Sequence, residues 1–114
     1  MSIWLKFLRG VLVMDDDDLV KILEESFCLF KERLSDEDFK KVNSINFDKN
    51  KTGWELVARD PYLGGKFASV VLEKVQALNL LKNDKKNEFI EFIGDNYMKS
   101  EPIDLLEFKK FLKN

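Results

Sequence analysis

The chain has 114 residues, of which 45% are hydrophobic and 35% charged, and its formal net charge is −2. This length is sufficient for a single domain, residues 1–114, that buries a hydrophobic core without disulfides or structural metals. The low Pro and Gly content argues against extensive disorder. Because an obligate nucleic-acid-binding protein normally carries a basic excess, the charge argues against direct nucleic-acid binding.

Histidine is absent, and cysteine occurs once, as Cys28. The lack of histidine removes the usual general base, the Ser-His and Cys-His nucleophile pairs, and the commonest transition-metal ligand. A single cysteine excludes an intramolecular disulfide and a cysteine-cluster zinc site. We therefore expect a non-catalytic protein with no cofactor and no metal, compatible with a reducing cytoplasm.

The first segment, residues 2–14, is apolar but is interrupted by Lys6 and Arg9. It is shorter than the roughly 20 apolar residues that a membrane-spanning helix needs, and it lacks the cleavage site of a signal peptide. As a helix it would carry its apolar side chains on one broad arc. We expect this helix to pack on the core, and the alternative is a helix that lies in a membrane interface.

Four consecutive aspartates at residues 15–18 predict the start of a second helix. Carboxylates accept hydrogen bonds from the free N–H groups of a helix start and complement its dipole. Apolar residues recur on one face up to about residue 34, and Cys28 falls on the opposite, charged face. We interpret Cys28 as a surface thiol, because a reactive thiol needs a base or cation beside it.

Two further capping patterns follow. Ser35 and Asp38 have the spacing of a capping box and predict a short helix. Thr52 and Glu55 have the same spacing and predict a helical segment that Pro61 ends. Residues 45–58 could instead form a hairpin, since their apolar residues also suit short strands. The helix is favoured because alternation between apolar and polar residues is poor.

Residues 66–82 have the most extensive apolar surface of any predicted helix. On a helix, the polar residues form one narrow strip, and apolar residues cover most of the remaining circumference. Such a helix is usually surrounded by others. The two glycines before it, Gly64 and Gly65, are interpreted as a tight entry into this helix. The sequence therefore predicts an all-α fold: a compact bundle of five to seven helices around a central buried helix at about 66–82.

Two helices complete the prediction. Residues 85–99 should form a helix capped by Asn83 or Asp84, with one apolar face. That face carries Phe89, Ile90, Phe92, Ile93 and Tyr97. Ser100 should cap the last helix, with Pro102 in its first turn. The apolar residues of this last helix are spread around it rather than striped.

Two motif fragments suggest ligand sites but fail at the decisive positions. Residues 48–53 begin like a calcium-binding EF-hand loop, yet Arg59 stands where the bidentate Glu is required. The sequence Gly64-Gly65-Lys66 hints at a phosphate-binding loop, but a P-loop needs Gly in place of Asp60 and Ser or Thr in place of Phe67. We interpret both as structural, the first as a turn.

The charge distribution is the strongest functional signal. Residues 15–38 carry a net charge of −7, whereas the rest of the chain is basic. Such a block serves helix capping and solvation, or it binds a basic protein. The candidate partner-binding residues are Asp15, Asp16, Asp17, Asp18, Glu24, Glu25, Glu32, Asp36, Glu37 and Asp38.

The function favoured by these observations is a non-catalytic protein-binding module, of the inhibitor or immunity type, that docks a basic partner such as a nuclease toxin. The first alternative is a membrane-peripheral or assembly protein that uses residues 2–14. The second alternative is a small enzyme with a carboxylate of raised pKa in a pocket. The sequence does not specify an oligomeric state.

Overall fold

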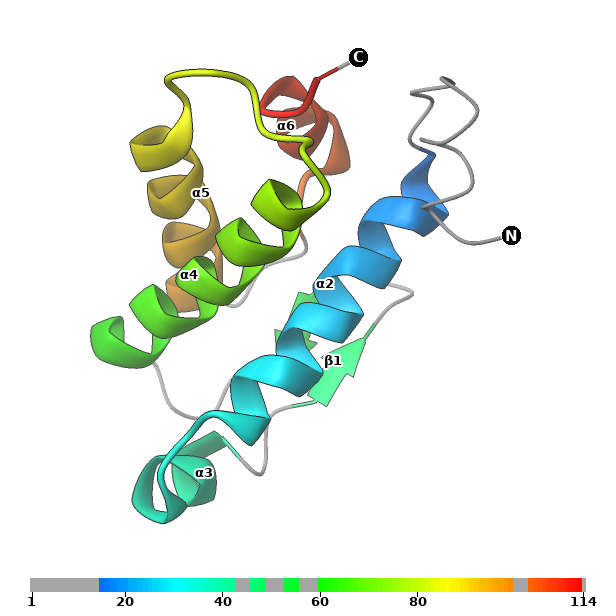
Figure 1. Ribbon diagram of the computed structural model, residues 1–114. Helices are drawn as coiled ribbons and strands as arrows, with labels where there is room; N and C mark the ends of the chain where they lie inside the picture. The colour runs from blue at the N-terminus through cyan, green and yellow to red at the C-terminus, as the bar shows by residue number, and fades with distance from the viewer. Residues whose placement is uncertain (1–14, 43–45, 49–52, 56–59, 100–102, 114) are drawn as a thin grey trace.

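The computed structural model describes residues 15–42, 46–48, 53–55, 60–99 and 103–113. The helices within these ranges are α2 (Asp16–Glu32), α3 (Asp36–Val42), α4 (Pro61–Ala77), α5 (Lys86–Lys99) and α6 (Leu105–Lys110). Two three-residue strands, β1 (Asn46–Asp48) and β2 (Gly53–Glu55), pair antiparallel. The predicted all-α class is confirmed, because helices form most of the described structure (Figure 1).

Helix α4 packs against α2 and against α5 (Figure 1). Its buried residues are Leu63, Gly64, Phe67, Ala68, Val70, Val71, Leu72 and Val75. Helix α2 is amphipathic: Leu19, Ile22, Leu23, Ser26, Phe27 and Phe30 are buried and the opposite face is charged. The buried Ser26 hydroxyl donates a hydrogen bond to the carbonyl of Ile22, 2.6 Å away, so its polar group is satisfied within the helix.

An aromatic cluster joins these three helices. Phe67 of α4 makes edge-to-face contacts with Phe27 and Phe30 of α2, with ring centroids 6.0 and 5.5 Å apart. The Phe67 ring also lies 5.7 Å from Tyr97 of α5. Phe67 and Tyr97 are completely buried. Edge-to-face pairs add stability beyond the apolar area that they bury.

A second cluster holds α6 on α5. The Phe89 ring lies 5.7 Å from Phe108 and 5.6 Å from Phe111, while Phe92 lies 5.3 Å from Phe111. The apolar residues of α6 were expected to be scattered, and their burial is correspondingly uneven. Phe108 is fully buried, whereas 71% of Leu106 is exposed.

The predicted bounds of the 66–82 helix are wrong at both ends. Helix α4 starts at Pro61, because the Asp60 side chain caps it by accepting a hydrogen bond from the Tyr62 N–H at 2.8 Å. Pro61 was expected to end a preceding helix, but at the first helical position its missing N–H does no harm. The helix ends at Ala77, and Asn79 then adopts a left-handed φ of 55°.

The favoured helical segment between Thr52 and Pro61 is also wrong where the structure describes it, and the hairpin alternative for residues 45–58 is correct there. Residues 53–55 form β2, and the register places Phe47 opposite Trp54. Pairing with β1 supplies hydrogen bonds that a reading of local periodicity does not anticipate. Thr52, Leu56 and Arg59 lie outside the described residues, as do residues 2–14, Ile45, Ser100 and Pro102.

The other caps were predicted with mixed success. Ser35 Oγ accepts a hydrogen bond from the Asp38 N–H at 3.2 Å, as expected for the start of α3. Helix α5 starts at Lys86, so Lys85 rather than Asn83 or Asp84 holds the N-cap position. Helix α6 starts at Leu105 and is capped by Asp104, not by Ser100, because Asp104 accepts from the N–H groups of Leu106 and Glu107.

The chain after α6 pairs with the α4–α5 connection. Leu81 and Leu112 form an isolated antiparallel bridge. The Lys82 N–H donates to the Phe111 carbonyl at 2.9 Å, and the Lys113 N–H donates to the Leu80 carbonyl at 2.6 Å. In Figure 1 this connection and the end of the chain lie together at the top of the view.

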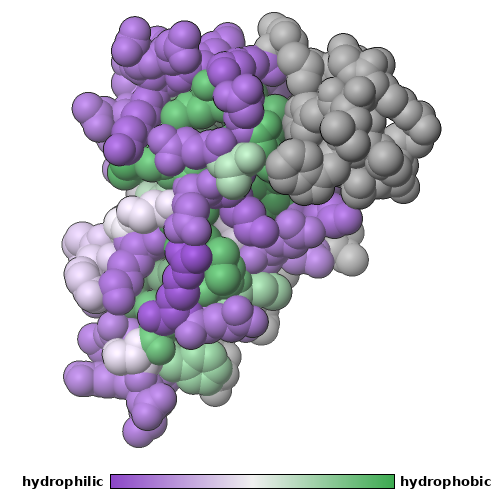
Figure 2. Space-filling view, in the orientation of Figure 1, coloured by the Kyte–Doolittle hydropathy of each residue, from purple (hydrophilic) through white to green (hydrophobic). Residues whose placement is uncertain are grey.

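Hydrophilic side chains cover most of the described part of the face in Figure 2, with apolar patches visible between them. Among the described helices, none has the length and apolar character needed to cross a membrane.

Candidate functional site

The ten candidate carboxylates lie along α2 and α3, not in one compact cluster. A 17-residue helix such as α2 is about 25 Å long. Residues 15–18 stand at the start of α2 and residues 36–38 follow its end, so the two acidic groups lie near opposite ends of that helix (Figure 1). A partner that contacted both groups would have to cover the length of α2.

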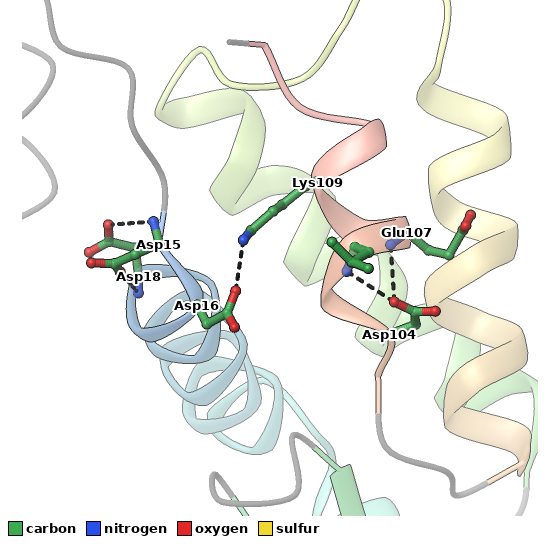
Figure 3. A network of polar contacts seen from close by, with 7 residues as sticks. Asp15, Asp16, Asp18, Asp104, Glu107 and Lys109 are labelled. Atoms are coloured by element: carbon green, nitrogen blue, oxygen red, sulfur yellow. Dashed lines mark hydrogen bonds and ion pairs between the residues drawn. The ribbon is translucent and has the colours of Figure 1, made fainter.

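Three of the four aspartates at the start of α2 have partners within the protein (Figure 3). Asp15 Oδ1 accepts from the Asp18 N–H at 2.9 Å, and Asp18 Oδ2 accepts from the Asp15 N–H at 3.3 Å. This reciprocal pair is a capping box. Asp16 Oδ1 lies 2.7 Å from Lys109 Nζ of α6. The role of these three is therefore at least partly structural.

Two more carboxylates form weaker ion pairs. Glu25 lies 3.6 Å from Lys74 Nζ of α4, and Asp38 lies 3.7 Å from Lys41 within α3. All the groups involved are partly exposed, and exposed ion pairs contribute about 0–1 kcal/mol to stability. These pairs reduce the negative potential that a partner would meet at Glu25 and Asp38.

The remaining five carboxylates are exposed and make no ion pair or hydrogen bond with any described residue; we call them the open carboxylates. They are Asp17, Glu24, Glu32, Asp36 and Glu37. Asp17, Glu24 and Glu32 are spaced seven and eight residues apart on α2, which places them on one strip of the helix at intervals of about 10–12 Å.

Cys28 lies on this same strip, four residues after Glu24 and four before Glu32, and it is exposed as predicted. Lys31, three residues after Cys28, is the nearest cation along α2, and its Nζ lies 5.2 Å from the centre of the Phe27 ring. No group of three or more His, Cys, Asp or Glu residues in the described part of the chain could hold a metal ion. The cation-site candidate at residues 48–59 falls partly outside that part.

Gly64, Gly65 and Lys66 do not form a loop before a helix. All three lie inside α4, so the expected tight entry at the two glycines is wrong. Gly64 instead packs closely against α5, since a Cβ atom there would lie only 3.2 Å from Tyr97 Cδ1. Lys66 Nζ lies 4.8 Å from the centre of the Tyr62 ring, a cation–π contact.

We consider two hollows of the described surface. The first, about 310 Å³, lies at the α4–α5 connection and is lined by Gln76, Asn79, Leu81, Lys82, Asn83, Asp84, Lys86 and Lys113. The second, about 270 Å³, lies between α2 and α4 and is lined by Phe30, Arg33, Leu34, Lys66, Ser69 and Val70. No open carboxylate lines either hollow.

The first hollow, which we call the lysine-lined hollow because Lys82, Lys86 and Lys113 line it, was not predicted from the sequence. Its lysines lie up to 31 positions apart in the chain and are brought together by the Leu81–Leu112 bridge. A bridge between two such distant residues leaves no local pattern that could have revealed it. The only sequence signal was the basic excess of residues 39–114.

Among the described residues, Tyr97 is the titratable group with the largest pKa shift, and its role is structural. Burial raises the pKa of the Tyr97 phenol to about 12, with a smaller contribution from the charge of Asp60. Tyr97 belongs to the aromatic core and lines neither hollow.

Comparisons with protein families, with curated proteins and with solved structures give no match.

Proposed function

We propose that this chain is a non-catalytic binding module that docks a basic protein through the open carboxylates of α2 and α3. The partner chemistry that fits best is a surface rich in Lys and Arg, such as the nucleic-acid-binding face of a nuclease toxin. The protein would then act as an inhibitor that occupies this face.

The observation that carries the proposal is the state of the five open carboxylates. Each is exposed and has no cationic partner among the described residues, in a protein where other carboxylates of the same block do. Unpaired like charges repel one another, and a basic partner relieves this repulsion on binding. Complementary charge also accelerates association and selects among partners.

The strip on α2 limits how a partner can bind. Asp17, Glu24 and Glu32 extend over about 22 Å, so a partner needs cationic groups distributed over a comparable length. Electrostatic docking of this kind weakens with rising salt, because exposed charges are screened beyond about 8–10 Å at physiological ionic strength.

The first test is affinity capture from a lysate of the native host at low and at moderate salt, followed by mass spectrometry. We expect one stoichiometric basic protein that is released by salt. The captured protein is then produced in pure form and its association rate with this chain is measured. An association rate that does not change with salt contradicts the proposal.

Charge reversal on α2 tests the surface itself. The double variant Glu24→Lys/Glu32→Lys should slow association by about tenfold or more, since steering accounts for factors of 10–10³ in on-rate. The matched control is Glu91→Lys/Asp95→Lys, which makes the same charge change at exposed positions of α5. Equal slowing by both variants would indicate a net-charge effect and would contradict docking on α2.

Cys28 provides an independent readout of the same surface. It is the only cysteine of the chain and lies between Glu24 and Glu32. Bound partner should protect its thiol from alkylation by a maleimide, and the Glu24→Lys/Glu32→Lys variant should lose this protection. Alkylation at the same rate with and without saturating partner would show that the partner binds elsewhere.

A further inference from the structure

We propose that the lysine-lined hollow at the α4–α5 connection binds a small diphosphate anion, either free or as the diphosphate of a nucleotide. This site is separate from the open carboxylates and does not depend on the proposed function.

The hollow has the volume and the polar groups that such a ligand needs. Its volume is about 310 Å³, at the lower end of the range for small-molecule sites. Lys82, Lys86 and Lys113 supply three ammonium groups, and Asp84 supplies the one opposing charge. The lining therefore has a net charge of +2, and one phosphate group, which carries nearly two negative charges at neutral pH, balances it. The second phosphate group of a diphosphate would accept hydrogen bonds from the amide donors of the lining.

The backbone holds these groups in place. The hydrogen bonds from Lys82 to Phe111 and from Lys113 to Leu80 fix the two strands of chain that carry the lysines. Lys113 Nζ also donates to Asn79 Oδ1 at 2.9 Å. Because this bond occupies the Asn79 oxygen, its amide nitrogen remains available to donate to an anion. Gln76 and Asn83 provide further amide donors in the lining.

The position of Lys86 also favours an anion. Lys86 is the first residue of α5, where the helix dipole disfavours a positive side chain. In contrast to Lys85, which lies 3.2 Å from Glu88, Lys86 has no ion pair with a described residue. A bound anion would compensate this unfavourable charge. A nucleic-acid backbone is a poorer match, since the chain as a whole carries a net charge of −2.

The test is an NMR titration of the full ¹⁵N-labelled chain at physiological salt with pyrophosphate, ADP and adenosine in separate arms. We expect pyrophosphate and ADP to shift the amide signals of residues 79–86 and 113, and adenosine to leave them unchanged. Tighter binding of ADP than of pyrophosphate would identify a nucleotide, and equal binding would identify the free diphosphate. Shifts caused by adenosine alone, or equally strong shifts with sulfate, would overturn the proposal.

Variants that should weaken binding and a variant that should strengthen it make the test more specific. Lys82→Gln and Lys113→Gln should each weaken pyrophosphate binding by about tenfold, the usual scale for a charge-assisted hydrogen bond. Asp84→Asn should strengthen binding, and it should fold normally because Asn tolerates the φ of 63° at this position. Lys99→Gln, at the far end of α5, is the matched control. The proposal is wrong if all four variants bind pyrophosphate equally.

Discussion

Arg33 and Glu73 form a bidentate ion pair that joins the end of α2 to α4. Arg33 Nη1 lies 2.7 Å from Glu73 Oε2, and Nη2 lies 2.8 Å from Oε1. The planar guanidinium matches a carboxylate in this geometry, which a lysine could not reproduce. The hydrogen bonds from Arg33 hold the pKa of Glu73 below its ordinary value of 4.5, against a smaller opposing effect of burial.

This pair predicts a pH-dependent contribution to stability. A carboxyl group whose pKa is lower in the folded state stabilises that state above the unfolded pKa, and the contribution is lost as the pH falls through the folded pKa. We therefore expect Glu73→Gln to be slightly less stable than the natural chain at neutral pH and equally stable well below pH 4.5. Urea unfolding of both proteins over this range measures the difference.

The effect should be small, since both side chains are about half exposed. Glu91→Gln removes an exposed carboxylate of α5 that has no ion pair with a described residue, and it serves as the control. A stability difference between Glu73→Gln and the natural chain that persists unchanged in acid would contradict the assigned pairing.

The acidic start of α2 allows capping to be separated from partner binding. Asp15→Ala breaks the capping box and should lower the free energy of unfolding by about 1 kcal/mol. Asp17→Ala removes an open carboxylate from the same turn and should cost only about 0.3 kcal/mol of helix-dipole interaction. Urea unfolding of the two variants gives both values. Equal losses would show that the charge of the turn, rather than the cap geometry, stabilises α2.

The buried faces were predictable from the sequence because periodicity depends only on neighbouring residues. Leu19, Ile22 and Phe27 on α2, and Phe89 and Ile93 on α5, are buried as predicted. Helix ends were less predictable. Pro61 and Gly64 interrupt a helical pattern in general, yet both are accommodated in α4 by the Asp60 cap and by close contact with Tyr97.

Periodicity in the sequence predicted only part of the candidate site. The exposure of Asp17, Glu24 and Cys28 follows from their positions on the polar face of α2. The partners of the other carboxylates do not follow, because Lys109 and Lys74 come from distant parts of the chain. A sequence pattern gives the charge of a block but not the internal ion pairs that offset it.

The aromatic cluster should dominate the stability of the fold. Phe67 is completely buried and contacts the rings of Phe27, Phe30 and Tyr97. Phe67→Ala should cost about 3–5 kcal/mol, and Phe67→Leu, which keeps much of the apolar volume, should cost less. Phe39 is 41% exposed, so Phe39→Ala should cost about 1 kcal/mol or less. Thermal and urea unfolding would rank the three variants, and a larger loss for Phe39→Ala would place the core elsewhere.

The two adjacent glycines of α4 provide a test of helix packing at the level of a single methyl group. A Cβ atom added at Gly65 would meet no atom within 4 Å, so Gly65→Ala should gain helix propensity and stabilise the fold by up to about 1 kcal/mol. At Gly64 the same methyl would lie 3.2 Å from the buried Tyr97 ring. Overpacking costs typically about 1–3 kcal/mol, which outweighs the propensity gain.

We therefore expect Gly64→Ala to lower the free energy of unfolding by about 1 kcal/mol, opposite in sign to Gly65→Ala. Urea unfolding of the two variants measures both changes on the same helix. Gly94→Ala on α5 is a second control, since a methyl group there also meets no atom within 4 Å. If Gly64→Ala stabilised the fold as much as Gly65→Ala, the Tyr97 ring would have room to move, and the contact between α4 and α5 would be looser than its geometry indicates.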